Sequence, residues 1–349
     1  MSLAIDPSSL VAFLVDLLNT PSPTGYHREA MAFCRERFTA LAGVEASFTR
    51  KGALMLRIPG EDAAPPPVGI TAHADTLGLM VREIKSNGRL AIHRIGGLLL
   101  HGAESENVTI RTADDRCYRG TFALNNTSVH VNKEAATSER TDRTMEVRID
   151  ERVSSKADVE ALGIQVGDFI FLDPRVEVTA SGFIKSRFLD DKASVAAIYG
   201  ALSALNHAGM KPKRTVLALI SNYEEVGHGG AADWPAELDE LLSIDMGVVG
   251  DGHNGDEFSV SLCTADGGGP YHFDMIQKLR ELAAAHNIPL KPDYFPYYAS
   301  DGTAYWGAGG GARVGLIGPG VYASHSYERT HTDAVVHTAH LIARYLLAE

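Results

Sequence analysis

The sequence TVLALISNYEEVG occupies residues 215–227 and joins a hydrophobic run to two adjacent carboxylates. Residues 215–221 are mostly apolar and too few for a helix, so they predict a strand that is buried on both faces. Glu224 and Glu225 follow directly after this strand. Pairs of glutamates are usually solvated, but open α/β sheets place their sites just outside the carboxyl ends of strands. This stretch therefore indicates an α/β fold with a candidate site at the edge of its sheet.

Similar apolar runs and helical patterns extend to both sides of this stretch. Further strands are expected at residues 53–58, 68–72, 241–249 and 314–317. Helices are expected from Pro7 and from His27 near the N-terminus, and at residues 192–208, 271–286 and 332–349. Helices that alternate with apolar strands predict an α/β domain with a mainly parallel sheet and helices on both faces.

A segment with a different pattern interrupts the α/β region. Between residues 79 and 178, short runs of alternating apolar and polar residues are separated by Gly, Asn and Asp. This pattern favours short strands, with one short helix near residues 156–162. We therefore expect residues 1–78 and 179–349 to form one catalytic domain, and residues 79–178 to form an inserted, mostly-β domain.

Composition and charge narrow the classes of function. Hydrophobic residues make up 45% of the 349 residues and charged residues 22%, as in ordinary globular proteins. The formal net charge of −12 argues against nucleic-acid and anionic membrane partners. The three cysteines are far apart, and no run has the length of a membrane span or the pattern of a signal peptide. We expect a soluble, cytoplasmic protein that binds neither nucleic acid nor membranes.

Histidines and carboxylates form five groups, four of which lie at or just past the expected strand ends. They are His73 with Asp75, Asp190 with Asp191, Glu224 with Glu225, Asp245, and His325 near Glu328. Each group alone has an ordinary explanation, since Asp190 and Asp191 could begin a helix and a salt bridge could satisfy Asp245. Together they supply nitrogen and oxygen ligands without cysteine, which suits zinc, cobalt or manganese. The set is large enough for two metal ions about 3.5–4 Å apart.

With these groups in this order, the sequence resembles the dinuclear-metal aminopeptidases of the glutamyl and deblocking type. That family includes tetrahedral, dodecameric enzymes and members labelled endoglucanase or cellulase M. The resemblance covers nearly the whole chain, including the turn at residues 21–25, the inserted β domain and the metal motifs. It implies a phosphorylase/hydrolase-like zinc peptidase fold and a dimerisation role for residues 79–178. It also implies a homo-oligomer, from dimer to dodecamer, that acts on short peptides.

The same resemblance implies a set of metal ligands. His73 and Asp245 would hold one ion, Glu225 and His325 the other, and Asp190 would bridge the two. We therefore expect two divalent ions per chain, with zinc as the first choice and cobalt or manganese as alternatives.

The remaining roles also come from the resemblance. Glu224 would be the general base, and Asp75 would orient His73 through its second ring nitrogen. The peptide bond after Asp190 is often cis in this family. The last motif reads His325-Ser326-Tyr327-Glu328 where His-Ser-Pro is usual, so His331 is an alternative ligand.

These residues predict metal-dependent hydrolysis of N-terminal residues from short peptides. An alternative is an amidase or deblocking hydrolase for a modified dipeptide, since the pattern is also similar to a subfamily linked to an acetylated glutamine-dipeptide osmolyte. A glycosidase is less favoured, because a two-carboxylate mechanism needs no histidines and only Trp234 and Trp306 are available for sugar stacking. A non-catalytic binding protein is disfavoured by the complete set of ligands and base.

Overall fold

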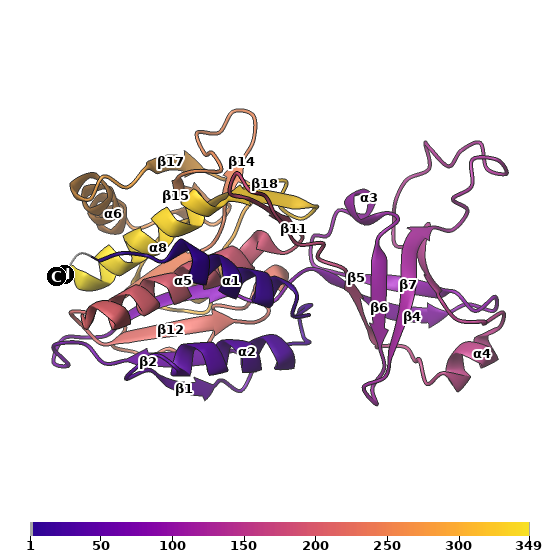
Figure 1. The fold of residues 1–349 in the computed structure, drawn as a ribbon, viewed down its shortest axis with the longest axis horizontal. Coiled ribbons are helices and arrows are strands. Elements are labelled where there is room, and N and C mark those ends of the chain that lie inside the picture. The colour runs from indigo at the N-terminus through magenta and orange to yellow at the C-terminus, as the bar shows by residue number, and fades with distance from the viewer. Residues whose placement is uncertain (1–2, 349) are drawn as a thin grey trace.

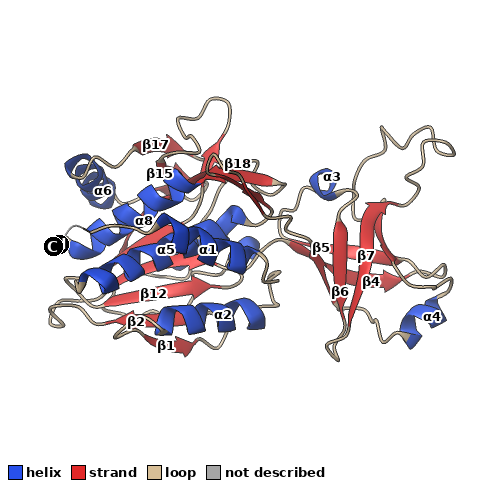
Figure 2. Ribbon diagram, viewed as in Figure 1, coloured by secondary structure: helices blue, strands red, loops and turns tan. Residues whose placement is uncertain are grey.

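The computed structural model describes residues 3–348, which form two lobes (Figure 1). The α/β lobe contains the first and the last elements of the chain, and the smaller lobe consists mainly of strands (Figure 2). The helices of the α/β lobe are α1 (Pro7–Leu18), α2 (Arg28–Thr39), α5 (Leu189–Ala208), the 3-10 helix η1 (Glu224–Val226), α6 (Phe273–Ala285), α7 (Asp301–Gly307) and α8 (Thr332–Leu347). Its strands are β1 (Glu45–Phe48), β2 (Leu54–Ile58), β3 (Val68–His73), β10 (Glu177–Val178), β11 (Phe183–Ser186), β12 (Val216–Ser221), β13 (Glu240–Ile244), β14 (Gly247–Val249), β15 (Val260–Asp266), β16 (Gly269–Pro270), β17 (Leu290–Tyr294), β18 (Arg313–Tyr322) and β19 (Glu328–His331).

The sheet of the α/β lobe is mixed, and the expected parallel pairing holds only at its centre. The continuous strand order is β1-β2-β12-β3-β13-β18-β19-β11-β10. Strands β12, β3, β13 and β18 pair in parallel. On either side of these four strands, the remaining strands of this order pair antiparallel with their neighbours. Short connections account for the pairs β1–β2, β10–β11 and β18–β19, because a tight hairpin can join only antiparallel strands.

Helices cover both faces of this sheet. Helix α8 packs along α5 and against α6, and Figure 1 shows α1, α5 and α8 in front of the strands. Val314 and Gly315 are consecutive in β18 and so point to opposite faces. Val314 lies against Gly302 of α7, whereas Gly315 lies against Met275 of α6. Helix α7 therefore lies on the opposite face from α6.

Helix α5 is buried along most of its length and begins with the Asp190-Asp191 pair. It is Ala-rich and lies among α1, α8 and β3, and small side chains allow such close packing on several sides. Asp190 and Asp191 have non-helical backbone angles, and the peptide bond between them is cis, as the resemblance implied. The helix ends at Gly209, which adopts the left-handed conformation typical of a C-cap glycine.

The smaller lobe is a closed six-stranded barrel. Its elements are β4 (Gly78–Ile84), β5 (Leu90–Ile95), α3 (Leu100–Ala103), β6 (Asn107–Arg111), β7 (Cys117–Leu124), β8 (Met145–Ile149), α4 (Lys156–Ala161) and β9 (Phe169–Leu172). The strands close in the order β4-β5-β8-β7-β6-β9, which leaves no unpaired sheet edge. Side chains of these strands form a hydrophobic core separate from that of the α/β lobe. The sequence predicted a mostly-β segment with one short helix at α4, but neither the closure nor α3.

None of the helices within residues 3–348 is both long enough and hydrophobic enough to cross a membrane.

Candidate functional site

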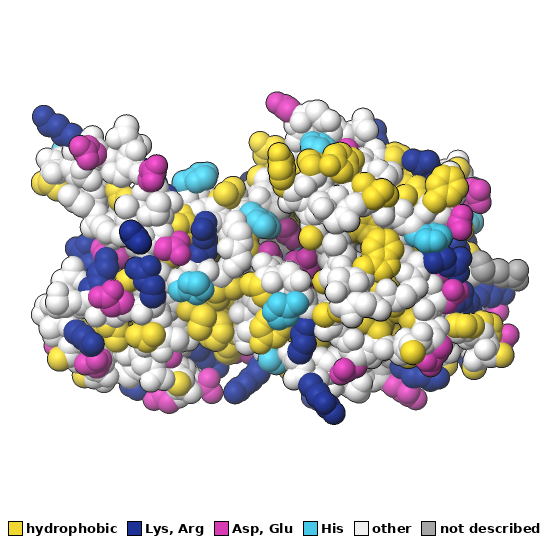
Figure 3. Space-filling view, turned by 180° about the vertical axis from the view of Figure 1, so that it is seen from behind, with side chains coloured by type: hydrophobic (Ala, Val, Ile, Leu, Met, Phe, Trp, Pro, Cys, Tyr) yellow, Lys and Arg dark blue, Asp and Glu magenta, His cyan; other side chains and the backbone are white. Residues whose placement is uncertain are grey.

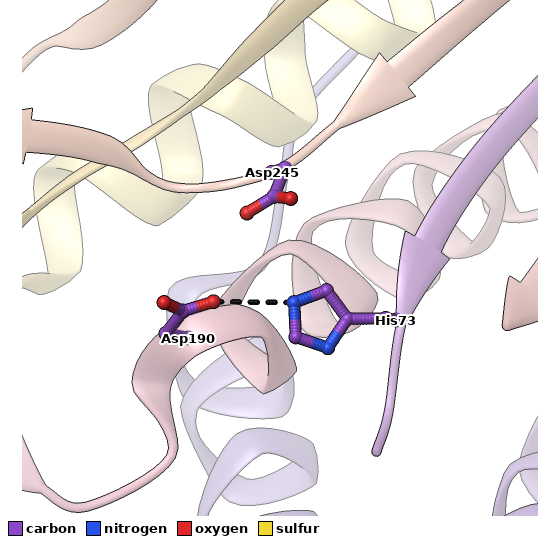
Figure 4. Close-up of side chains that lie close together, drawn as sticks. All are labelled: His73, Asp190 and Asp245. Atoms are coloured by element: carbon purple, nitrogen blue, oxygen red, sulfur yellow. Dashed lines mark hydrogen bonds and ion pairs between the residues drawn. The ribbon is translucent and has the colours of Figure 1, made fainter. Parts of the chain in front are cut away.

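The candidate ligands converge where the central strands end. His73 is the last residue of β3, Asp245 directly follows β13, and Glu225 lies in η1 after β12. These three strands are neighbours and run parallel, so their carboxyl ends share one edge of the sheet. Figure 4 shows His73, Asp190 and Asp245 directed toward a common space.

Asp190 stands between two groups of ligands and turns one oxygen to each. Its Oδ1 lies 3.2 Å from His73 Nε2, and its Oδ2 lies 3.6 Å from His325 Nε2. One group is His73, Asp190 and Asp245, and the other is Asp190, Glu225 and His325, each with ligand atoms within 4.8 Å of one another. The five residues expected as ligands thus form two groups that share one carboxylate. A bridging ligand needs this arrangement.

The chemistry of this donor set fits cations. Asp190 and Asp245 are 7% and 5% exposed, and within residues 3–348 the ion pairs of Asp190 and Glu225 are to histidines. Burial raises the pKa of Asp245 to about 8, despite the charge of His73. Burial and the charge of Asp190 raise the pKa of Glu225 well above its usual range. Anions at this site therefore need positive charge, and divalent metal ions would supply it.

Each histidine is held at Nδ1, which leaves Nε2 directed toward the carboxylates. His73 Nδ1 lies 2.9 Å from the Asp75 carbonyl oxygen, and His325 Nδ1 lies 3.2 Å from the Gly97 carbonyl oxygen. Metal-binding histidines commonly donate their second N–H to such an acceptor. Gly97 belongs to the barrel lobe, in the connection between β5 and α3. The barrel lobe therefore contributes directly to the orientation of one candidate ligand.

Asp75 contacts His73 through its backbone carbonyl rather than through its carboxylate. The nearest carboxylate oxygen is 3.7 Å from His73 Nδ1, beyond hydrogen-bond distance. That carboxylate instead accepts the backbone N–H groups of Glu224 at 3.2 Å and Glu225 at 3.4 Å, and the Thr24 hydroxyl at 2.6 Å. Asp75 thus meets the second ring nitrogen of His73 through its carbonyl, and its carboxylate has a further role, because it holds the turn that carries Glu224 and Glu225.

Glu224 lies next to the first group and faces the cavity of the site. Its Oε2 is 3.6 Å from His73 Nε2. Burial is the main cause that raises the pKa of Glu224 well above its usual range, and the nearby Asp245 charge acts in the same direction. A carboxyl group with a raised pKa, close to candidate metal ligands, has the properties of a general base.

Glu328 organises the site in a way that the sequence analysis did not assign. This glutamate is 2% exposed, and its two oxygens accept the backbone N–H groups of Asp190 at 3.0 Å and His325 at 3.1 Å. It therefore ties the shared carboxylate to the loop of the last ligand. Its position three residues after His325 was the available signal, since that spacing lets a side chain turn back to a backbone N–H.

His331, the alternative ligand, lies outside both groups. Its Nε2 is 2.8 Å from the Ser181 carbonyl oxygen, and its Nδ1 accepts the Asp333 backbone N–H at the start of α8. Both ring nitrogens are therefore engaged elsewhere, and His325 is the histidine of the second group.

A cavity of about 580 Å³ opens beside these residues. Its lining includes Asp190, Glu224, Glu225, Asp245 and His325. Figure 3 shows acidic side chains within a hollow between the two lobes, with histidine and hydrophobic side chains around it. The candidate ligands and base are thus accessible to a small molecule from solvent.

Known proteins resemble this chain in sequence and in fold. The family model described as M42 glutamyl aminopeptidase matches residues 52–341. The putative aminopeptidase YhfE of Bacillus subtilis is 46% identical over 331 residues, which cover 95% of each chain. The TET aminopeptidase of a marine sediment thaumarchaeote superimposes with a TM-score of 0.87 at 20% identity, over 97% of this chain and 96% of that one. The TET1 peptidase of Pyrococcus horikoshii, described as assembling into a tetrahedron or a large octahedral shell, gives a TM-score of 0.85 at 18% identity, over 98% and 100%.

Proposed function

The chain belongs to the M42 glutamyl aminopeptidase family of hydrolases, and from this premise we propose that it releases N-terminal residues from short peptides with the help of two metal ions. The observation that carries the proposal is the position of Asp190, whose two oxygens face two separate groups of ligands. A single metal ion would need only one of these groups.

Two divalent ions fit the residues at the site. His73 and Asp245 would hold one, Glu225 and His325 the other, and Asp190 would contact both. Zinc is the first choice because histidine and carboxylate are its usual ligands in catalytic sites, and cobalt and manganese share them. When bound, such a pair polarises the scissile carbonyl and lowers the pKa of a water molecule.

The chain's own residues would move the proton and hold the site. Glu224 would take the proton of the attacking water and pass it to the leaving amine. The Asp75 carboxylate keeps Glu224 in place by accepting its backbone N–H, and Glu328 does the same for Asp190. The buried carboxylates of Asp75 and Glu328 would thus fix the backbone that carries Glu224 and Asp190, which preserves the geometry of the site during turnover.

The proposal extends to assembly. We assign catalysis to residues 1–78 and 179–349, and dimer contacts to the barrel of residues 79–178, in a homo-oligomer between a dimer and a dodecamer. Two observations support this assignment: the barrel projects from the α/β lobe (Figure 1), and it exposes Val129 and Val131, which are 65% and 77% exposed. The related TET1 peptidase, which this chain covers completely, is described as assembling into a tetrahedron or a large octahedral shell. A cytoplasmic location stays a prediction from the sequence.

The proposal is tested by metal content together with a substrate panel. The panel contains aminoacyl amides, short peptides and N-acetylated dipeptides, each with and without a chelator. We expect two metal ions per chain and chelator-sensitive release of free N-terminal residues. Turnover confined to blocked substrates would make the protein a specialised amidase or deblocking hydrolase, and chelator-resistant hydrolysis of a glycoside would revive the two-carboxylate alternative.

A further inference from the structure

The cavity beside the metal ligands has a wall that is largely hydrophobic. Apart from the candidate ligands and Glu224, its lining residues are Leu99, Gly227, Val248, His253, Phe295, Pro296, Tyr297, Tyr298, Ala299 and Ser324. Residues 295–299 are consecutive, so a single segment supplies half of this wall. The cavity volume of about 580 Å³ is within the range of small-molecule sites and accommodates an amino acid side chain with part of a peptide.

This aromatic segment is fixed next to the metal centre. The Tyr298 hydroxyl donates a hydrogen bond to the carbonyl oxygen of Met246, the residue after Asp245. The Phe295 ring is 2% exposed, and its centroid lies 5.5 Å from that of Tyr298 and 5.6 Å from that of His253. These contacts hold Phe295 and Tyr298 in place, whereas Tyr297 between them is fully exposed. A substrate whose amino end lies at the ligands would therefore have its first side chain within reach of this apolar segment.

The wall offers no partner for a charged substrate side chain. Among the described residues that line the cavity there is no lysine or arginine, and every carboxylate belongs to a candidate ligand or to Glu224. The histidine of this wall, His253, already has a partner, because its Nδ1 lies 3.1 Å from an oxygen of Asp293. Burying an unpaired charge is costly, whereas burying an apolar side chain is favourable.

We propose that this cavity selects an N-terminal residue with an uncharged, hydrophobic side chain, such as leucine or phenylalanine, over glutamate or lysine. The inference rests on the proposed aminopeptidase function and adds the class of residue that it releases. It separates this chain from the glutamyl preference in the family's description, because a glutamate side chain on this wall would meet no lysine or arginine.

The test measures kcat/KM of the metal-loaded enzyme for dipeptides X-Ala, with X as Leu, Phe, Glu or Lys. We expect leucine and phenylalanine to exceed both charged residues by about tenfold or more. A higher kcat/KM for glutamate or lysine would overturn this inference and leave the aminopeptidase function intact. Absence of hydrolysis for all four, with both metal ions bound, would overturn the proposed function together with the inference.

A charge placed on the wall provides the second arm of the test. Leu99 lines the cavity and is 42% exposed, so Leu99→Lys adds a cation without filling the core. This variant should raise the glutamate-to-leucine ratio of kcat/KM about tenfold. Met210→Lys is the matched control, since Met210 is 37% exposed and outside the cavity. An unchanged ratio in folded Leu99→Lys would overturn the assignment of this wall to the first side chain.

Discussion

Replacement of Gly97 by alanine should weaken one metal site and spare the other. A Cβ atom at Gly97 would lie 2.7 Å from His325 Nδ1 and 2.9 Å from Cε1. Ordinary contacts are about 3.5 Å, so the imidazole and the loop must separate by roughly 0.6–0.8 Å. That movement breaks the 3.2 Å hydrogen bond from His325 to the Gly97 carbonyl and shifts Nε2 relative to Glu225.

The expected loss follows from the role of such hydrogen bonds in metal sites. Removing the partner that orients a metal-binding histidine typically lowers affinity roughly 10–100-fold, about 1.4–2.7 kcal/mol. The His73 group should change much less, because His73 is held by Asp75 and not by the barrel lobe. The variant should therefore bind one ion nearly normally and the second ion weakly.

Metal titration of the chelator-treated protein measures both affinities. Cobalt absorption or calorimetry should resolve two binding steps, of which one weakens in Gly97→Ala. Gly307→Ala is the matched control, since a Cβ atom there meets no heavy atom within 4 Å. Two unchanged affinities in a correctly folded Gly97→Ala variant would refute the proposed orientation of His325 by the barrel lobe. Equal weakening of both binding steps would refute the expectation that the barrel lobe supports only the metal site of His325.

Three further predictions concern the base, its surroundings and the bound metal. Glu224→Gln should retain both metal ions and lower kcat by about 10²–10⁴-fold, as checked by metal analysis and steady-state kinetics; near-normal turnover would exclude Glu224 as the base. Glu328→Gln should reduce the free energy of unfolding by about 1–3 kcal/mol in urea titrations, because an amide cannot accept both the Asp190 and His325 N–H groups; an unchanged midpoint would contradict this role. Metal-free protein should lose stability as pH rises from about 4 to about 8, since the pKa of Asp245 is raised to about 8 in the fold and the unfolded chain releases its proton first. Thermal unfolding at pH 5.5 and pH 8 with and without metal checks this, and equal melting temperatures of the metal-free protein at both values would contradict it.

Local sequence was sufficient to identify the central strands and the ligand types. Residues 216–221 and 68–73 are apolar enough to indicate buried strands, and the structure has β12 and β3 there. His73 and Glu225 were recognisable as candidates because they stood at the ends of such strands. Asp245 was recognisable as a carboxylate inside the expected strand of residues 241–249, which the structure divides into β13 and β14. This information is local, since one short segment contains both the apolar run that predicts a buried strand and the residue at the end of that strand.

Only the tertiary structure decided which atoms support these ligands. The sequence pattern did not reveal the closed barrel, the antiparallel strands at the sides of the sheet, or the carbonyl of Gly97 against His325. That last contact joins residues 228 positions apart, and the Asp75 carboxylate reaches Glu224 across 149 positions. Such pairings depend on how separate elements pack, and a backbone carbonyl carries no side-chain signature in the sequence. The sequence by itself therefore indicated the candidate ligands, whereas packing between the two lobes determined how His325 is held.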